Sequence, residues 1–378
     1  MSSDSYSEPK ADDADSSDRF VISGWRALLD RQLASVVVGS LVIFAVSAFV
    51  QIRYGSYELS IGEAFAAVFD PAVIGDPNVL AGLLLGGEFP DVETATLIVW
   101  NIRIPRIIVG VFVGANLAVS GAIFQAVTRN ELASPYVLGV SAGAGLAVLV
   151  VLILVPALSN YLPFVAALGG ATAFLLVYAI AWQGGTSPVR LILAGVIVAM
   201  IGNSLQTGLF FFAGNTGVVQ TALSWLTGSL TGKDWAQVRL ALPWTAIAVT
   251  LALAGSRQLN VLLLGEQTAS SLGMNVERTR FGLSVVAIAA ASIAVAVAGL
   301  VAFVGLVVPH LVRNLVGSDY RRLMVGCVFA GPALVTAADV GARLALSPLQ
   351  LPVGIVTGLL GGPYFLYLMR RNRNVGDF

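Results

Sequence analysis

The chain has 378 residues, of which 57% are hydrophobic and only 11% are charged, and its mean hydropathy is +0.86. Soluble domains carry about 25% charged residues, so this composition excludes an ordinary soluble protein and predicts an all-α integral membrane protein. The net charge is zero, which argues against nucleic acid as a partner because nucleic-acid-binding domains usually present a basic face.

The start of the chain differs in composition from everything that follows. It contains many serines, and its acidic residues outnumber its basic ones: Asp4, Glu8, Asp12, Asp13, Asp15 and Asp18 against Lys10 and Arg19. Such a segment cannot bury enough apolar area to fold, and a secretory signal would begin with basic residues instead. We therefore predict an acidic, disordered cytoplasmic tail and lead-in over residues 1–32, followed by a transmembrane domain over residues 33–371.

Apolar stretches recur through the rest of the chain. A helix that crosses a bilayer needs roughly 20 apolar residues, and proline, glycine and charged residues mark where such stretches end. These criteria predict about ten crossings, at residues 33–50, 98–127, 136–155, 162–181, 190–213, 240–255, 281–299, 302–316, 323–346 and 351–369. The seventh and eighth crossings are interrupted by Gly299, Gly305 and Pro309, so the sequence defines their boundaries least.

The basic residues predict the orientation of these crossings. Cytoplasmic loops of membrane proteins carry an excess of Lys and Arg. With the N-terminus inside, the inner loops hold most of the basic residues, whereas the outer side holds only Arg53, Arg103, Arg106, Lys233, Arg239 and Arg343. We therefore expect a multi-pass protein of the cell membrane with both termini in the cytoplasm.

Three outer arginines oppose this bias. Arg103 and Arg106 are three residues apart and share one helical face, and Arg343 lies at the outer end of the ninth crossing. Such arginines either fix the depth of their helices or bind a partner. Asp339 lies four residues before Arg343, in the favourable order for an ion pair on a helix. An ionisable residue within the membrane is also a functional candidate, so both roles stay open for Asp339.

Two loops are long enough to form structure of their own. The outer loop, at about 51–97, contains a short amphipathic segment at residues 60–69. The inner loop at 256–280 predicts one or two short helices at the membrane surface, ended by Gly273, because glycine commonly closes helices in the left-handed conformation. They are either plain surface helices or a docking platform for a soluble partner. A further short outer helix is predicted at 220–228.

The sequence carries no motif for nucleotide hydrolysis or for catalysis. A Gly-x-x-x-x-Gly-Lys-Ser/Thr phosphate loop is missing. His310 is the one histidine, and no cysteine cluster accompanies it to make a metal site, so we expect neither a cofactor nor an enzyme activity. Few carboxylates lie in the crossings, which argues against a proton or sodium relay. The chain therefore carries no sign of an energy source of its own.

A set of short motifs runs in a fixed order through the crossings. The motifs are WNIRIPR at 100–106, SGAIFQ at 120–125, NELASP at 130–135, LGVSAG at 138–143, LAG at 193–195, WLTGS at 225–229, LGE at 264–266, LG at 272–273, FVGLVVPH at 303–310, ADVGAR at 338–343 and LPVGIVT at 351–357. Together they resemble the FecCD-type permeases, the transmembrane subunits of cobalamin, ferric-siderophore and haem ABC importers. The resemblance covers about residues 33–371. Glu131 departs from it, since family members often have proline there.

The resemblance implies a type II ABC importer permease fold of about ten helices with an inverted repeat. It implies a homodimer with one pathway between the subunits, two cytoplasmic ATP-binding subunits and an extracellular or periplasmic-type substrate-binding protein. The last crossing would share the dimer interface, in keeping with its glycines at every fourth position, Gly354, Gly358 and Gly362.

The resemblance also assigns residues to these contacts. Arg103, Arg106 and Arg343 would dock the binding protein. The coupling helices at 256–280 would meet the ATP-binding subunits through Leu264, Gly265, Glu266, Leu272 and Gly273. The crossing at 190–213 would line the pathway with Asn203, Ser204 and Gln206.

We therefore expect the permease subunit of an ABC importer that moves a metal chelate, cobalamin or a ferric siderophore, into the cytoplasm. A haem importer permease is an alternative within the same class. A stand-alone secondary transporter is an alternative from another class, but it needs a coupling carboxylate in the membrane, for which Asp339 is the one candidate. An intramembrane enzyme would need a catalytic dyad or a metal cluster.

Overall fold

The computed structural model describes residues 30–371 apart from residues 56, 88 and 348. Nearly all of the predicted acidic tail lies outside these residues, so the domain division at residue 33 stays a prediction.

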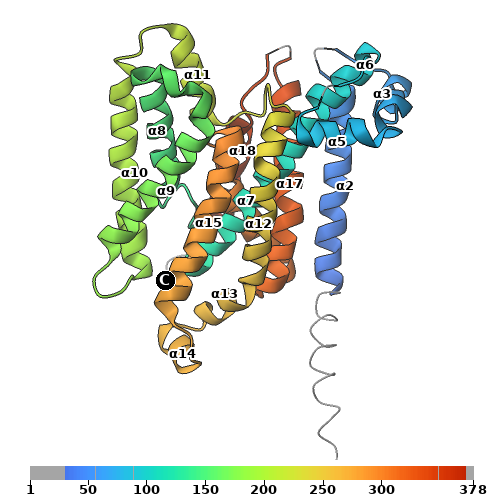
Figure 1. Ribbon diagram of the computed structural model, residues 1–378. Helices are drawn as coiled ribbons and strands as arrows, with labels where there is room; N and C mark the ends of the chain where they lie inside the picture. Colours follow the sequence, from blue (N-terminus) through green and yellow to red (C-terminus); the bar gives the residue numbers. More distant parts are fainter. Residues whose placement is uncertain (1–29, 56, 88, 348, 372–378) are drawn as a thin grey trace, which may run out of the picture.

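The described chain is a helical bundle (Figure 1). In chain order its helices are α2 Arg31–Arg53, α3 Ile61–Val68, α4 Pro71–Ile74, α5 Pro77–Leu85, α6 Thr94–Ile98, the π-helical turn η2 Val99–Arg103, α7 Ile104–Val127, α8 Val140–Leu154, the 3-10 turn η3 Pro156–Tyr161, α9 Leu162–Ala181, α10 Pro188–Phe210, α11 Thr216–Thr227, α12 Trp235–Ala254, α13 Ser256–Leu263, α14 Glu266–Ser271, α15 Val276–Ala298, α16 Val304–Val316, α17 Tyr320–Leu344 and α18 Val353–Arg371.

Each of the ten predicted crossings coincides with a helix. In the described part of the chain, seven helices are long and apolar enough to cross a membrane, and α8, α16 and α18 are shorter apolar helices. The segment from α3 to α5 is also apolar, but it bends by 97° and lies across one end of the bundle beside α2 (Figure 1). An all-α membrane fold of about ten helices is therefore confirmed.

The short elements predicted in the loops are also present. Ser60 caps α3 in a capping box with Glu63, in which each side chain accepts a backbone N–H of the other residue. The 256–280 loop forms α13 and α14, and Gly273 follows α14 with a φ of +79°, the left-handed conformation expected there. The third short helix, α11, is longer than predicted.

The centre of the bundle is α7, which is buried along nearly its whole length. It packs against α15, α16 and α17, and small residues let the backbones come close. A Cβ atom on Gly121 would lie 1.7 Å from the carbonyl oxygen of Gly305 in α16, and one on Gly114 would lie 2.4 Å from the carbonyl carbon of Gly331 in α17. Such contact between backbones is how helices associate in lipid, where apolar burial alone gives little drive.

The break between α15 and α16 differs from the sequence prediction. Gly305 and Pro309 lie inside α16, and the chain leaves the helical conformation only over residues 299–303. Non-helical backbone at membrane depth needs hydrogen-bond partners from the protein. Here Leu300 N–H donates to the Trp225 carbonyl at 2.8 Å, and Ser229 N–H donates to the Ala298 carbonyl at 2.7 Å.

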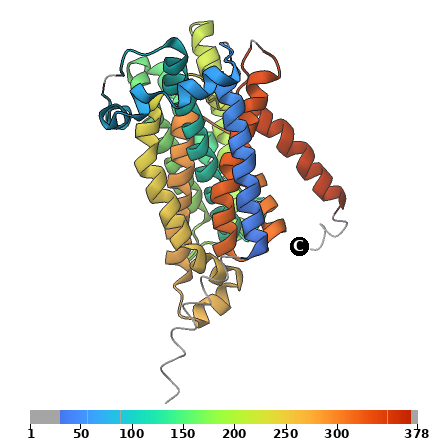
Figure 2. The same ribbon diagram turned by 90° about the vertical axis from the view of Figure 1, so that its right-hand side faces the viewer.

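The two ends of the bundle differ in construction. One end carries α13 and α14, and we call it the α14 end. The opposite end carries α3 to α6 and α11, and we call it the α3 end (Figure 1). The last helix, α18, leans away from the bundle toward the α14 end (Figure 2). Candidate sites lie at both ends.

We predict that Gly121→Leu prevents normal packing of α7. Overpacking a tight interior costs about 1–3 kcal/mol and sometimes more, and here the new side chain would meet backbone that has no room to move. The matched control is Gly39→Leu in α2, because no described atom lies within 4 Å of the Cβ position of Gly39. Apparent melting temperature in detergent should fall clearly for Gly121→Leu and stay near wild type for Gly39→Leu; equal values would contradict this packing.

Candidate functional site

A buried ion pair joins α7 to α17 at the α3 end. Arg106 meets Asp339 with two parallel hydrogen bonds, Nη2 to Oδ1 at 2.7 Å and Nε to Oδ2 at 2.9 Å. The two side chains are only 4% and 1% exposed. Arg106 Nη1 also donates to Gln350 Oε1 at 2.8 Å. Paired, bidentate geometry of this kind is what makes a charge tolerable away from water.

The other two predicted docking arginines hold the end of α2. Arg343 Nη1 donates to the carbonyls of Gln51 and Tyr54 at 3.0 and 2.9 Å, and Arg103 donates to the carbonyls of Ile52 and Tyr57. The last carbonyls of a helix have no partner within the helix, and cations are favourable at this end of the helix dipole. Arg103 and Arg343 therefore cap α2 and attach it to η2 and α17.

These positions change two interpretations of the sequence. The expected pair between Asp339 and Arg343 is wrong, because Asp339 binds Arg106, which is 233 positions away in the chain. The docking role of Arg103, Arg106 and Arg343 stays a prediction, and all three side chains are buried with partners inside the chain. The geometry favours an internal role for them. It also occupies Asp339, the carboxylate that a proton-coupled transporter would need.

The predicted pathway residues of α10 do not all face the same way. Asn203 and Ser204 are exposed in the single chain. Gln206 is buried, and its Nε2 donates to the Ala142 carbonyl of α8 at 2.9 Å. Gln206 therefore attaches α10 to α8, whereas Asn203 and Ser204 lie on the open face of α10. Whether any of the three lines a pathway stays a prediction.

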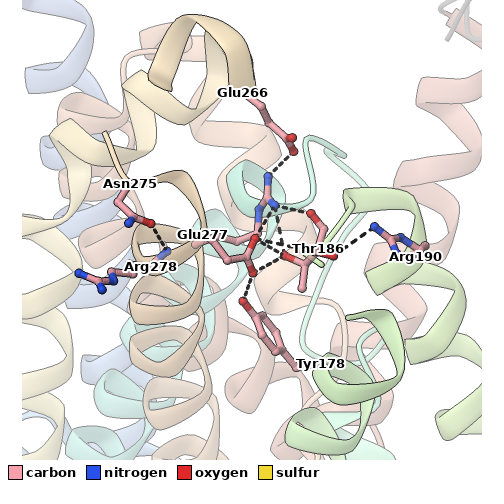
Figure 3. A network of polar contacts seen from close by, with 9 residues as sticks. Tyr178, Thr186, Arg190, Glu266, Asn275, Glu277 and Arg278 are labelled. Carbon is pink, nitrogen blue, oxygen red and sulfur yellow. Dashed lines mark hydrogen bonds and ion pairs between the residues drawn. The ribbon is translucent and has the colours of Figure 1, made fainter. Parts of the chain in front are cut away.

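The predicted coupling residues lie together at the α14 end. Leu264 and Leu272 expose 58% and 65% of their surfaces, and they flank α14 on either side. Gly265 turns the chain from α13 into α14 with a φ of +104°, which favours glycine. The Glu266 side chain is half-exposed, and its Oε1 accepts a hydrogen bond from Arg280 Nη2 of α15 at 2.6 Å (Figure 3). Nothing in the sequence pointed to Arg280 as the partner of Glu266.

A second set of contacts at the same end was missed by sequence reasoning. Glu131, in the connection from α7 to α8, lies 3.4 Å from His310 Nδ1 and 3.5 Å from Arg313 Nη1, both on α16. The contact with His310, followed by the charge of Arg313, lowers the pKa of the Glu131 carboxyl. The cluster ties the α7–α8 connection to α16. The one feature of the sequence that pointed to this cluster is the glutamate at position 131, where family members often have proline.

We predict that loss of one member of the Arg106–Asp339 pair is worse than loss of both. Arg106→Leu leaves a buried carboxylate without its cation, which costs about 3–5 kcal/mol, whereas Arg106→Leu with Asp339→Leu removes both charges. The apparent melting temperature in detergent should fall far more for the single variant than for the double variant. Arg53→Leu is the control, because the Arg53 guanidinium lies over the Tyr54 ring at 4.8 Å and has no carboxylate partner among the described residues. Equal losses in the single and double variants would contradict the pairing.

Comparison with known proteins places this geometry in a family. Residues 41–371 match the FecCD transport family. An Fe(3+)-citrate import system permease protein of Bacillus subtilis is 43% identical over 286 residues, which are 75% of this chain and 85% of that protein. A cobalamin import system permease protein of Halobacterium salinarum is 40% identical over 284 residues, 75% of this chain and 76% of that protein.

A solved structure agrees with the fold as well. It is described as an inward-facing conformation of a metal-chelate type ABC transporter, and it matches with a TM-score of 0.75 and 25% identity over 89% of this chain and 99% of that one. The family match extends from α2 to α18, and both relatives align over about three quarters of the chain. The resemblance seen in the motifs is thereby confirmed, and the chain belongs to the FecCD transport family.

Proposed function

We propose that the chain is the transmembrane subunit of an ABC importer that moves a metal chelate, cobalamin or a ferric siderophore, into the cytoplasm. ATP hydrolysis in two partner subunits supplies the energy. The family membership supports the class of transporter, and the names of the relatives support the class of cargo. The iron-citrate and cobalamin permeases have almost the same sequence identity to this chain. Both chelates are therefore candidate cargoes, and an uptake measurement distinguishes them.

The observation that carries the proposal is the surface at the α14 end. Two large apolar side chains, Leu264 and Leu272, are exposed on either side of α14. Exposed apolar groups on a surface that faces water mark sites of protein contact. The arginine distribution predicts that this end faces the cytoplasm, where ATP-binding subunits lie. We therefore propose that α13 and α14 receive these subunits.

A second copy of the chain fits the open faces of α10 and α18. On α10 the exposed large apolar side chains include Leu193, Ile197, Met200, Ile201 and Leu205. On α18, no described atom lies within 4 Å of the Cβ positions of Gly358 and Gly362, whereas Gly354 packs on the Thr227 carbonyl. Small residues on an open helix face favour close helix contact in the membrane. We propose that the homodimer forms here, with Asn203 and Ser204 beside the pathway.

The substrate-binding protein would then dock at the α3 end. The arginines predicted for this contact already donate to internal partners, so we propose that they support the docking surface from beneath by fixing α2, α7 and α17. In this scheme the α3 end is held rigid, and closure of the ATP-binding subunits moves α13 and α14. A wide pathway with weakly polar walls leaves the choice of chelate mainly to the binding protein.

The proposed function predicts ATP-dependent uptake. Vesicles that hold this chain with its ATP-binding subunit and its binding protein should accumulate either labelled cobalamin or a labelled ferric siderophore, and ATP with Mg²⁺ should be required. Labelled haem serves as the third cargo. Uptake by this chain without the ATP-binding subunit would contradict the proposal and favour a secondary transporter.

The orientation predicts which end reacts from outside. With Cys327, which is buried, replaced by alanine, single cysteines at Gln267→Cys on α14 and Asn78→Cys on α5 give one probe at each end. A membrane-impermeant maleimide added to intact cells should label Asn78→Cys and spare Gln267→Cys, and inside-out vesicles should reverse the pattern. Labelling of Gln267→Cys in intact cells would place the α14 end outside.

A further inference from the structure

A polar network at the α14 end connects helices that are far apart in the chain, and Arg280 of α15 lies at its centre. The Arg280 side chain is 2% exposed. Its Nη2 donates to Glu266 of α14 at 2.6 Å, and its Nη1 donates to the carbonyl of Thr186 at 2.6 Å and to Thr186 Oγ1 at 3.2 Å. Thr186 lies in the connection from α9 to α10. One guanidinium therefore contacts both α14 and the residues that lead into α10.

Glu277, three positions before Arg280, holds the far side of this network. Its carboxylate accepts from Thr186 N–H at 3.1 Å, from Thr186 Oγ1 at 2.8 Å, and from the Tyr178 hydroxyl of α9. It also lies 3.5 Å from Arg280 Nη1. Arg190, in the first turn of α10, donates to the Gly185 carbonyl at 3.1 Å. Figure 3 shows Glu266 above this group, with Thr186 and Arg190 on one side.

The contacts on the two sides of Arg280 differ in strength. On the Thr186 side, Arg280 and Glu277 use several hydrogen bonds, and Thr186 is buried. On the α14 side a single ion pair is present, and the Glu266 side chain is 49% exposed. Water and salt weaken an exposed pair far more than a buried one. The Glu266 contact can therefore open while Arg280 keeps its place.

The short helix α14 is also built to move as a unit. Gly265 and Gly273 flank it, both with positive φ values, and such short non-helical turns absorb changes in backbone angle. Inside the bundle, α14 is anchored by the buried Ala269 and by the pair with Arg280. While the Glu266–Arg280 pair is closed, a displacement of α14 can reach the α9–α10 connection through Arg280 and Thr186.

We propose that Arg280 is a positioning residue that couples the movement of α14 to the start of α10, and that Glu266 is its releasable contact. The proposal deepens the proposed function and rests on it, because it assigns the step between the partner ATPase and the helix beside the pathway. Arginine suits this place because its planar fork reaches two acceptors in fixed directions, which a lysine cannot do.

The first test uses the isolated chain and does not depend on transport. In the Cys327→Ala background, spin labels at Ser270→Cys on α14 and at Val189→Cys on α10 report the distance between these helices. Glu266→Ala should broaden the distance distribution, and Gln267→Ala should leave it unchanged. Gln267 is the matched control because it is the next residue on α14 and is exposed. Melting temperatures of both variants should stay close to that of the starting protein.

The second test uses the complete transporter and compares uptake with ATP hydrolysis. Coupling between two sites typically changes an equilibrium by 5- to 150-fold, so we expect Glu266→Ala to lower the number of chelates imported per ATP by about 5-fold or more. ATP hydrolysis is measured in parallel on the same samples, so that a loss of ATPase docking would be seen as a fall in hydrolysis. Glu266→Gln keeps an acceptor oxygen without the charge, so its ratio should lie between those of Glu266→Ala and wild type. Arg280→Lys should lower the ratio as well.

The outcomes separate coupling from a structural contact. Equal ratios of uptake to hydrolysis for Glu266→Ala and Gln267→Ala would overturn the proposal, as would an unchanged distance distribution for Glu266→Ala. Parallel losses of uptake and hydrolysis would assign Glu266 to ATPase docking instead. If wild type showed no ATP-driven uptake, the proposed function would fail, and the distances in the isolated chain would still decide whether Glu266 and Arg280 join α14 to α10.

Discussion

The bidentate ion pair between Arg106 and Asp339 joins α7, at the centre of the bundle, to α17. A charge in the apolar interior is tolerated only with a close, hydrogen-bonded partner, so the pair fixes α7 and α17 relative to each other. The close contact between Gly114 and Gly331 along the same two helices allows the approach that the pair requires. Through Arg103 and Arg343 the same region also holds the end of α2. Contacts between distant parts of the chain thus hold the α3 end together.

The α14 end is constructed in the opposite way. Glycines with positive φ values lie on either side of α14, the apolar side chains Leu264 and Leu272 are exposed, and the ion pair between α14 and α15 uses a half-exposed carboxylate, Glu266. Such a difference suits a protein in which the α14 end moves when partner subunits act on it and the α3 end keeps its shape. Conformational changes of this kind use a few hinge residues at element ends and leave packed cores intact.

The sequence predicted the crossings well because their signal is local. Length, hydropathy and the prolines and glycines between stretches mark each helix without knowledge of its neighbours. The short helices of the 256–280 loop followed from Gly273 in the same way. The bounds of α16 were harder to predict from the sequence, because Gly305 and Pro309 suggested breaks in the helix. In the structure Gly305 lies inside α16 and allows its close approach to Gly121.

The partners of charged groups could not be predicted in this way. Asp339 has Arg343 one turn away in sequence, and nothing in the sequence shows that Arg106 reaches it from 233 positions earlier. The resemblance assigned the arginines of the α3 end to a docking surface, but the carbonyls at the end of α2 that accept from Arg103 and Arg343 come together with them only in the fold. Arg280 was counted among the inner basic residues, and its role emerged only from the positions of Glu266 and Thr186.

In the proposed importer, ATP-binding subunits act on this chain through the α14 end. The most direct measurement is a single-particle structure of the chain assembled with its ATP-binding subunit. We expect two copies of each, with Leu264 and Leu272 buried against the ATP-binding subunits and the Arg106–Asp339 pair unchanged at the far end. An assembly in which α14 stays free in solvent, or in which the ATP-binding subunits contact another face, would contradict it.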